Sequence, residues 1–232
     1  MNPPKPSLVE LSIESTGRQN LPDRIYAELK SRILSGLVKP GERLLEKSLS
    51  EDLEVSRTPL REALNRLSHD DLVIFRPNSG YSAAPLSSNG FGQLQDLRVI
   101  IEPKVASLAA IRATRDDIES LRRCAEMPAV EDGDDSTFIN FCQANARFHL
   151  LLVRAARNTM METIVMSALD QYQRPAYLGI GRVTDHEKAS KCHLDIVDAV
   201  EARDPAKAEI VMGSHVIGGS ERITRALVSR GL

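Results

Sequence analysis

The sequence predicts a mainly α-helical protein of two domains. Aromatic residues make up 4% of the 232 residues and none of them is Trp, which favours helices packed through Leu, Ile, Val and Ala. Apolar residues recur at helical spacing along most of the chain after Pro22. The stretch PLSSNG, residues 85–90, separates a first part that contains a short extended region from a second part that is helical throughout.

The composition is that of a soluble globular protein, with a formal net charge of -2, 42% hydrophobic and 27% charged residues. Cys124, Cys142 and Cys192 are odd in number and widely spaced, which indicates a reducing compartment and no disulfide framework. The start MNPPKPSLVE lacks the pattern of a signal peptide. No stretch approaches the ~18 uninterrupted apolar residues of a membrane span. We therefore expect a cytoplasmic protein with no membrane partner.

The first domain is expected at residues 21–85, after a mobile arm at residues 1–20 that is rich in Pro and Ser. A helix is predicted from Pro22 to Ser35, and the Gly- and Pro-containing segment GLVKPGERL ends it. A short second helix is predicted in EKSLSEDLEV, where Ser48 and Glu51 have the spacing of a capping box.

A third helix, RTPLREALNRLSHDDL, is predicted to begin after Ser56, whose side chain can cap it. The segment VIFRPNSGYSAAPL then has two short extended runs around a turn at residues 77–80, which predicts a small β-hairpin. The inner face of the third helix is expected to consist of Leu60, Ala63, Leu64 and Leu67.

Residues 86–90 are expected to form a linker, and residues 91–232 an all-helical bundle of about six helices. In its first helix, FGQLQDLRVIIEPKVASLAAIRA, a kink is expected at Pro103. Thr114 is expected to cap the second helix, and Asp204 followed by proline to begin the last. The apolar stripe of the first of these helices contains Leu94, Leu97, Ile101, Val105 and Leu108.

Three small helices followed by a β-hairpin have the outline of a winged helix-turn-helix, whose third helix enters the DNA major groove. The first two turns of that helix present polar side chains opposite its leucine stripe, and arginine suits bidentate contact with guanine. A lysine at the start of the second helix and the tip of the wing could reach phosphates or the minor groove. The candidate DNA contacts are therefore Lys47, Arg57, Thr58, Arg61, Asn78 and Gly80.

Charge does not decide between this interpretation and one in which the arginines simply solvate a surface helix. Residues 1–80 contain 12 Lys+Arg and 12 Asp+Glu, so the first domain lacks the basic footprint common among DNA-binding domains. The order of the elements favours DNA binding.

The segment PGERLLEKSLSEDLEVSRTPLREALNRLSHDDLV and the wing after it resemble the DNA-binding domain of GntR-superfamily transcription regulators. The pieces P-G-x-x-L, L-x-x-x-L and S-R-T-P-L-R-E-A-L occur together and in order, which is far more specific than a generic helix-turn-helix pattern. The resemblance implies that Arg57 and Arg61 read bases of double-stranded operator DNA, that Lys47 assists, and that Gly80 shapes the wing. The sequence His69-Asp-Asp stands where many relatives carry a Gly, which changes a turn and not the reading surface.

In the helical domain, three of the five histidines fall on inner stripes of predicted helices. His149 lies one turn after Asn145, His193 and His215 lie among aliphatic residues, and His186 is expected in a loop. A buried polar group without a partner costs ~1–3 kcal/mol, and convergence on one ion would satisfy all four inner residues together. For any one of these histidines alone, a satisfied core residue is the better interpretation, and their spacing matches no local metal-binding signature.

The helical domain also resembles the effector domain of the FadR-like branch of the superfamily, the FCD type. The matching pieces are LRVIIEPKVASLAA, NARFHLLLVRAARN and HLDIVDAVEARDPAKA, followed by a late histidine. Many members bind a metal through an Asp or Asn, a His four residues later and two more histidines. The resemblance therefore implies a divalent metal, zinc or nickel first and manganese as a further option, held by Asn145, His149, His193 and His215. Asn145 stands where many relatives have Asp, which would weaken the metal or alter its identity.

Arg98, in the first helix of this domain, is at the place where members of the FCD type hold the carboxylate of a ligand. Its alternative roles are an ordinary surface arginine or a partner for Asp96 or Glu102. Three neutral imidazoles and a neutral amide leave a divalent ion with its full charge, and an octahedral ion would keep two positions open. A small organic acid with a carboxylate and a hydroxyl fits those positions.

The sequence therefore predicts a homodimeric, ligand-responsive transcription regulator and not an enzyme, with repression relieved by a small carboxylate as the expected direction. One alternative is a metal-dependent enzyme acting on a small hydroxy acid, because an open metal site can activate water. No candidate general base has a defined spacing to the histidines, and an enzyme would not need Arg57 and Arg61 before a wing. Another alternative keeps DNA binding but makes the metal purely structural, or the signal itself.

Overall fold

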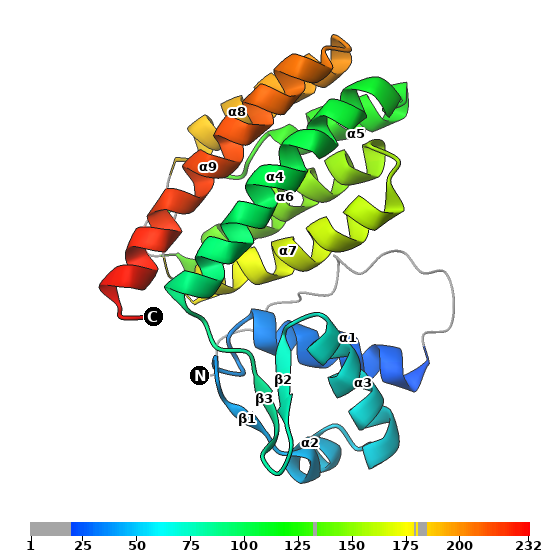
Figure 1. Ribbon diagram of the computed structural model, residues 1–232, viewed down its shortest axis with the longest axis vertical. Helices are drawn as coiled ribbons and strands as arrows, with labels where there is room; N and C mark the ends of the chain where they lie inside the picture. The colour runs from blue at the N-terminus through cyan, green and yellow to red at the C-terminus, as the bar shows by residue number, and fades with distance from the viewer. Residues whose placement is uncertain (1–19, 132–133, 179, 181–184) are drawn as a thin grey trace. The chain divides into compact units, whose positions relative to one another are not determined.

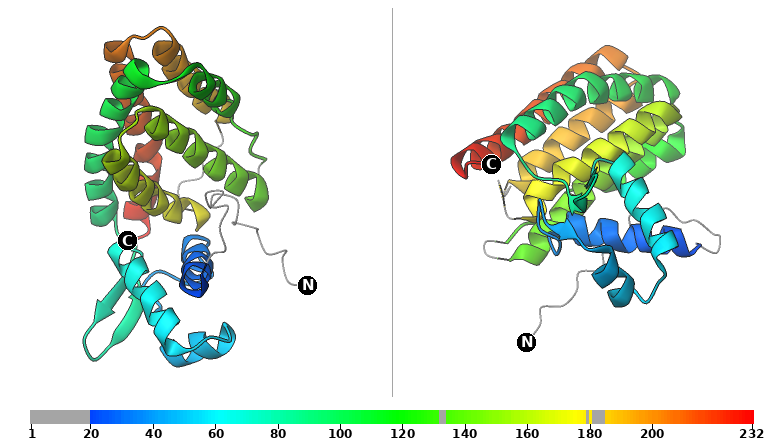
Figure 2. Two further views of the ribbon diagram at one scale, coloured as in Figure 1. Left: turned by 90° about the vertical axis from the view of Figure 1, so that its right-hand side faces the viewer. Right: turned by 60° about the horizontal axis from the view of Figure 1, so that its bottom comes forward.

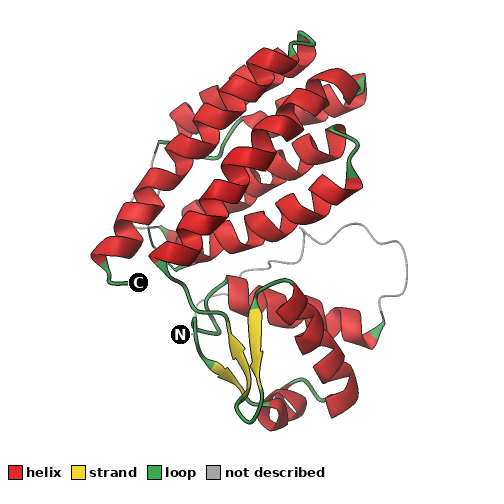
Figure 3. Ribbon diagram, in the orientation of Figure 1, coloured by secondary structure: helices red, strands yellow, loops and turns green. Residues whose placement is uncertain are grey.

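The computed structural model describes residues 20–131, 134–178, 180 and 185–232 (Figure 1). The chain divides into two compact units, Met1–Leu86 and Ser87–Leu232, and each contains its own apolar core. The fold is mainly helical, as predicted (Figure 3). The arm predicted at residues 1–20 lies, apart from Asn20, outside the described residues.

The first unit contains three helices and a small antiparallel sheet, which confirms the prediction of three helices and a hairpin. Strand β1 was not expected, because two residues are too few to show an alternating pattern; it pairs with β3 and makes the strand order β1-β3-β2. The elements are α1 (Leu21–Leu34), β1 (Arg43–Leu44), α2 (Glu46–Asp52), α3 (Arg57–His69), β2 (Val73–Arg76) and β3 (Gly80–Ala83).

The helix ends in this unit differ from two expectations. The capping box predicted at Ser48 is wrong, since α2 begins after Leu45 and Ser48 lies inside it. Ser56 is the N-cap residue of α3, but its side chain makes no capping hydrogen bond. The predicted turn between β2 and β3 is present, and Asn78 and Gly80 have φ angles of 65° and 76°, in the left-handed region that glycine and asparagine tolerate best.

The predicted inner face of α3 is correct, and it decides which side chains of this helix face solvent. Its four apolar residues are completely buried, against α1 and the sheet. The opposite face, which carries Arg57, Thr58 and Arg61, is exposed. The buried residues of α3 are Leu60, Ala63, Leu64 and Leu67.

The second unit is a helical bundle, as predicted (Figures 1 and 2). Thr114 caps α5 in a capping box with Asp117, and Asp204 caps α9, both as expected. Two expectations are corrected: residues 88–90, predicted as linker, form the first turn of α4, and His186 is the first residue of α8. The helices are α4 (Ser88–Arg112), α5 (Arg115–Ala125), α6 (Asp135–Ala155), α7 (Thr159–Tyr177), α8 (His186–Glu201) and α9 (Pro205–Ser229).

The first half of α4 departs from the predicted apolar stripe. Val105 is buried as expected, and Ile101 and Leu108 pack against the core, but Leu97 is 39% exposed. The buried side of this half carries Gln95, Arg98 and Glu102. Helix α4 therefore directs charged groups into the bundle in its first half, and its second half packs on the core through apolar residues. No helix in the described part of the chain is long and apolar enough to span a bilayer.

Candidate metal and ligand site

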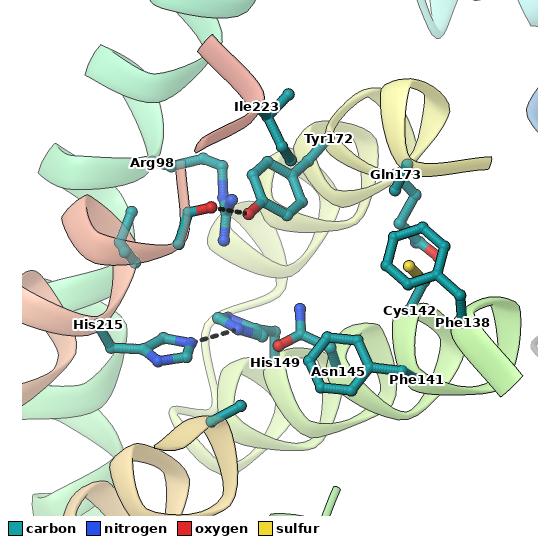
Figure 4. A pocket seen from close by; sticks show the side chains of 14 residues that line it. Arg98, Phe138, Phe141, Cys142, Asn145, His149, Tyr172, Gln173, His215 and Ile223 are labelled. Carbon is teal, nitrogen blue, oxygen red and sulfur yellow. Dashed lines mark hydrogen bonds between the residues drawn. The ribbon is translucent and has the colours of Figure 1, made fainter. Parts of the chain in front are cut away.

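The three histidines singled out in the sequence meet inside the second unit. They come from α6, α8 and α9, and one ring nitrogen from each lies within 4.8 Å of the others. The Nε2 atom of His215 is 3.2 Å from Nε2 of His149, as Figure 4 shows, and 3.3 Å from Nε2 of His193. With metal–nitrogen bonds of ~2.0–2.1 Å, two imidazole ligands of a tetrahedral zinc ion stand ~3.3 Å apart. The two distances from His215 therefore match a shared ion, whereas the pair of His149 and His193, within 4.8 Å, would move closer together on binding it.

A carboxylate orients His149. Its Nδ1 lies 2.5 Å from Oε2 of Glu102, and both side chains are buried. When Nδ1–H donates to this carboxylate, Nε2 carries the lone pair and faces the other two histidines. Metal-ligating histidines commonly have a carboxylate partner of this kind, which fixes the tautomer and the orientation of the ring.

The environment keeps the other two histidines neutral. Burial, followed by the nearby His149, lowers the pKa of His215 to about 3. Burial also lowers the pKa of His193 well below its ordinary value, and the ring stacks on Phe148 with 3.9 Å between the centroids. Neutral imidazole is the form that binds metal. If Nε2 of His215 carries a hydrogen, it can donate that hydrogen to only one of the two neighbouring Nε2 atoms. The lone pair of the other Nε2 atom then has no hydrogen-bond donor within the cluster, and a cation between the three rings would bind it.

Asn145 lies one turn before His149 on α6, and its amide reaches the same cavity (Figure 4). Within the described residues this amide forms no hydrogen bond. The side chain is therefore available as a further oxygen donor beside the three histidines.

Arg98 is buried, with 3% of its surface exposed, so the alternative of an ordinary surface arginine is wrong. Its Nε donates to Glu102, which was one of the two partners considered, and its guanidinium carbon lies 3.9 Å from the centre of the Tyr172 ring. Burial alone would raise the pKa of the Glu102 carboxyl, but the charges of Arg98 and His149 outweigh burial and hold this pKa well below its usual range.

A cavity of about 90 Å³ opens beside these groups. At one end are the side chains of Arg98, Asn145, His149, Tyr172 and His215. The other end is lined by residues of α6, α7 and α8, namely Phe138, Phe141, Cys142, Ala176 and Ala189, while Ile223 of α9 lies beside Tyr172 (Figure 4). A molecule in this cavity would meet polar and apolar surfaces at opposite ends.

Two of the three glycines of α9 have close neighbours. The hydroxyl of Tyr172 donates to the Gly219 carbonyl at 3.0 Å, and a Cβ on Gly219 would lie 3.2 Å from that hydroxyl. A Cβ on Gly213 would lie 3.7 Å from Pro103. Gly219 thus lets Tyr172 approach α9 and cover Arg98, whereas a Cβ on Gly218 would meet no atom within 4 Å.

The sequence did not reveal the role of Glu102 toward His149, nor the apolar end of the cavity. Glu102 follows Arg98 by four residues, so a pair between them was one of the alternatives considered for Arg98. The contact of Glu102 with a histidine 47 residues later depends on how α4 packs on α6. The phenylalanines of α6 were a usable signal, since Phe138, Phe141, Asn145 and His149 recur at the spacing of one helical face.

The candidate DNA contacts lie on exposed parts of the first unit. Lys47, Arg57, Thr58 and Asn78 are exposed. Arg61 is also exposed, and its Nε lies 2.6 Å from a carboxylate oxygen of Glu46 on α2. Surface pairs of this kind are weak, so the guanidinium can exchange its partner for a base.

A recognition helix with an exposed arginine face, a wing, and a second unit with an internal histidine cluster define a winged-helix transcription regulator with a separate helical domain. The chain belongs to the GntR family: residues 21–82 match the family model described as bacterial regulatory proteins, gntR family, and residues 93–218 match the FCD domain.

Relatives agree with this assignment. The uncharacterized HTH-type transcriptional regulator YdhC of Bacillus subtilis strain 168 is 29% identical over 144 residues, which are 61% of this chain and 63% of that protein, less than two thirds of its length. The HTH-type transcriptional repressor RspR of Escherichia coli strain K12 is 27% identical over 215 residues, 93% of each protein. The structure of E. coli McbR/YncC shares the fold, with a TM-score of 0.73 at 21% identity over 92% of this chain and 100% of that one. Since the family and these relatives are transcription regulators, the enzyme alternative is set aside.

Proposed function

We propose that this regulator is a homodimeric repressor whose affinity for operator DNA falls when a small carboxylate binds at a metal in the second unit. The observation that carries the proposal is a cluster of three imidazoles in a GntR-family chain, two of which, His149 and His215, line the same cavity as the buried Arg98. The name of RspR, a repressor, supports the direction of the effect. A repressor that contacts its operator directly would act in the cytoplasm of a bacterium, as expected from the sequence.

The metal would be held by Asn145, His149, His193 and His215, with zinc or nickel expected before manganese. Such an ion supplies a positive charge that a carboxylate can bind. Arg98 and Glu102 pair with each other, and imidazole binds a metal in its neutral form, so an anion is the natural partner for the charge of the ion. Glu102 accepts from Nε of Arg98 and Gln95 accepts from Nη1 in a long contact of 3.4 Å, so Nη2 is the atom that we expect to bind the effector carboxylate.

A purely structural metal, or a metal that is itself the signal, remains the alternative. Operator binding by metal-loaded and metal-free protein, each with and without carboxylate, separates the three cases. A structural metal changes operator binding only through unfolding. A sensed metal changes operator binding without any acid, and the proposed mechanism requires both metal and acid.

The face that we propose for the dimer is formed by the outer sides of α4 and α9, which lie side by side and antiparallel (Figure 1). Ile100 and Ile210 are 72% and 71% exposed there, and exposed apolar groups gathered on one face mark an interface. The charges of Lys104 and Glu209 pair with each other on this face. A second copy can therefore cover the same face by two-fold symmetry, with the Lys104–Glu209 pair already compensated within each copy.

Replacement of Ile100 by Asp is expected to convert the dimer to a monomer, because two carboxylates would enter an apolar interface about a two-fold axis. Sedimentation equilibrium measures the change. Ile164→Asp is the matched control, since Ile164 is an exposed isoleucine of α7, away from this face. A monomeric parent protein, or equal dissociation in both variants, would exclude this interface.

Arg57→Ala and Arg61→Ala are each expected to weaken operator binding by about 1–3 kcal/mol, which is on the order of 5- to 150-fold, if each arginine contacts a base. Fluorescence anisotropy with operator and scrambled duplexes at fixed salt measures both affinity and specificity. Arg115→Ala, which removes a 92% exposed arginine side chain from the second unit, controls for net charge. A loss no larger than that of Arg115→Ala would place the reading surface elsewhere.

A further inference from the structure

We propose that the effector is a monocarboxylate with a branched aliphatic or small aromatic body, and not a di- or tricarboxylate. The proposal rests on the function proposed above, which places a carboxylate beside the metal ligands. It comes from the shape and polarity of the rest of the same cavity, in which the charged end and an apolar end lie along one helix (Figure 4).

Helix α6 sets the direction of the cavity. Its lining residues change from Asn145 and His149 at one end to Phe138, Phe141 and Cys142 at the other. At a rise of ~1.5 Å per residue, Phe141 lies about 6 Å along the helix axis from Asn145 and about 12 Å from His149. A ligand whose carboxylate is held near His149 therefore extends its carbon chain toward the phenylalanines.

The far end contains no charged side chain among the residues described there. Its walls are side chains of α6 together with Ala176 and Ala189. Gln173 also lines it, but its amide nitrogen donates one N–H to the Leu169 carbonyl at 3.4 Å and its amide oxygen accepts from the Tyr177 hydroxyl at 2.9 Å. The oxygen and one of the two N–H groups of Gln173 are thus engaged within α7.

Charge excludes a second carboxylate from this end. Of the described residues that line the cavity, Arg98 alone carries a permanent positive charge, and it lies at the polar end, paired with Glu102. A carboxylate between Phe138 and Phe141 would lose its hydration without gaining a counter-ion, which is strongly unfavourable. An aliphatic or aromatic group at the same place is instead removed from water.

The cavity volume limits the size of the effector. About 90 Å³ is several times the ~10–15 Å³ that one water molecule occupies by a comparable measure. The space therefore suits a 2-hydroxy acid with a short branched or aromatic side chain better than a long-chain fatty acid.

Isothermal titration of the metal-loaded, full-length protein with three 2-hydroxy acids tests the proposal. Malate and 2-hydroxy-4-methylpentanoate have the same head and the same number of non-hydrogen atoms, but one ends in a carboxylate and the other in an isopropyl group. Lactate has the head alone. We expect 2-hydroxy-4-methylpentanoate to bind at least about tenfold more tightly than either of the others, as is typical for filling an apolar pocket.

Two variants test whether the apolar end of the cavity causes the preference for the branched acid. Phe141→Ala is expected to reduce the advantage of the branched acid over lactate, and Ala176→Leu to reduce it by filling the same end. Metal content and the melting temperature of each variant establish that it is folded, and Ala176→Leu keeps the test valid if Phe141→Ala does not fold.

The outcomes separate this inference from the function on which it rests. If malate or lactate binds as tightly as the branched acid, the inference is wrong while the carboxylate site stands. If none of the three acids binds, both fail. If the branched acid is preferred but neither variant changes the preference, the apolar end of this cavity is not its source and the inference fails.

Discussion

His193→Ala and His149→Ala should each abolish a bound metal that the parent protein carries at about one ion per chain. Removing one of three neutral imidazoles leaves too few donors to compete with water and buffer for a divalent transition metal. Elemental analysis of protein purified without chelator measures the metal-to-protein ratio directly.

His69→Ala is the matched control for this experiment, because His69 is an exposed histidine of the first unit and should retain the metal. A parent protein that contains no metal, even after incubation with zinc, nickel or manganese, would overturn the metal-anchored effector model. DNA binding by the first unit would survive that result, and the effector would have to bind elsewhere.

Glu102→Ala is expected to destabilise the second unit by about 3–5 kcal/mol, because Arg98 would remain buried with its charge uncompensated. Arg98, Glu102 and His149 are at most 3% exposed, so water from the adjoining cavity would replace the carboxylate only poorly. Differential scanning calorimetry of the metal-free protein resolves the transition of the second unit from that of the first.

Glu209→Ala provides the comparison, since the pair of Lys104 and Glu209 is exposed and should contribute no more than about 1 kcal/mol. The double variant Arg98→Met with Glu102→Leu should recover much of the lost stability, because replacing both members of a buried pair leaves no charge unpaired. Equal effects of Glu102→Ala and Glu209→Ala would show that the buried pair has no structural role.

Local sequence patterns were sufficient for the helices and for the inner faces of most of them. The leucine stripe of α3 predicted both its buried face and the exposed position of Arg57 and Arg61, because opposite faces of a helix follow directly from its period. Thr114 and Asp204 predicted the starts of α5 and α9 for a similar reason, since a cap involves only residues three or four apart.

Local sequence patterns were insufficient where the position of a residue depends on a partner far away in the sequence. The stripe on α4 was correct at Val105 but wrong at Leu97, because the first half of this helix supports a buried polar site and places Gln95, Arg98 and Glu102 inside. Strand β1 was missed since it exists only through its pairing with β3. The three histidines were identified individually from their helical stripes, but whether their rings meet depends on the packing of α6, α8 and α9.

The sequence by itself therefore determined the order of elements, the exposed face of the recognition helix and the residues able to bind a metal, because each depends on neighbours within a few turns. Only the tertiary structure decided that Glu102 orients His149, that Arg98 is buried, and that Phe138 and Phe141 extend the cavity away from the charged groups. These contacts join helices that are distant in the sequence. Their geometry depends on how the helices pack, and the periodicity of a single helix does not encode that packing.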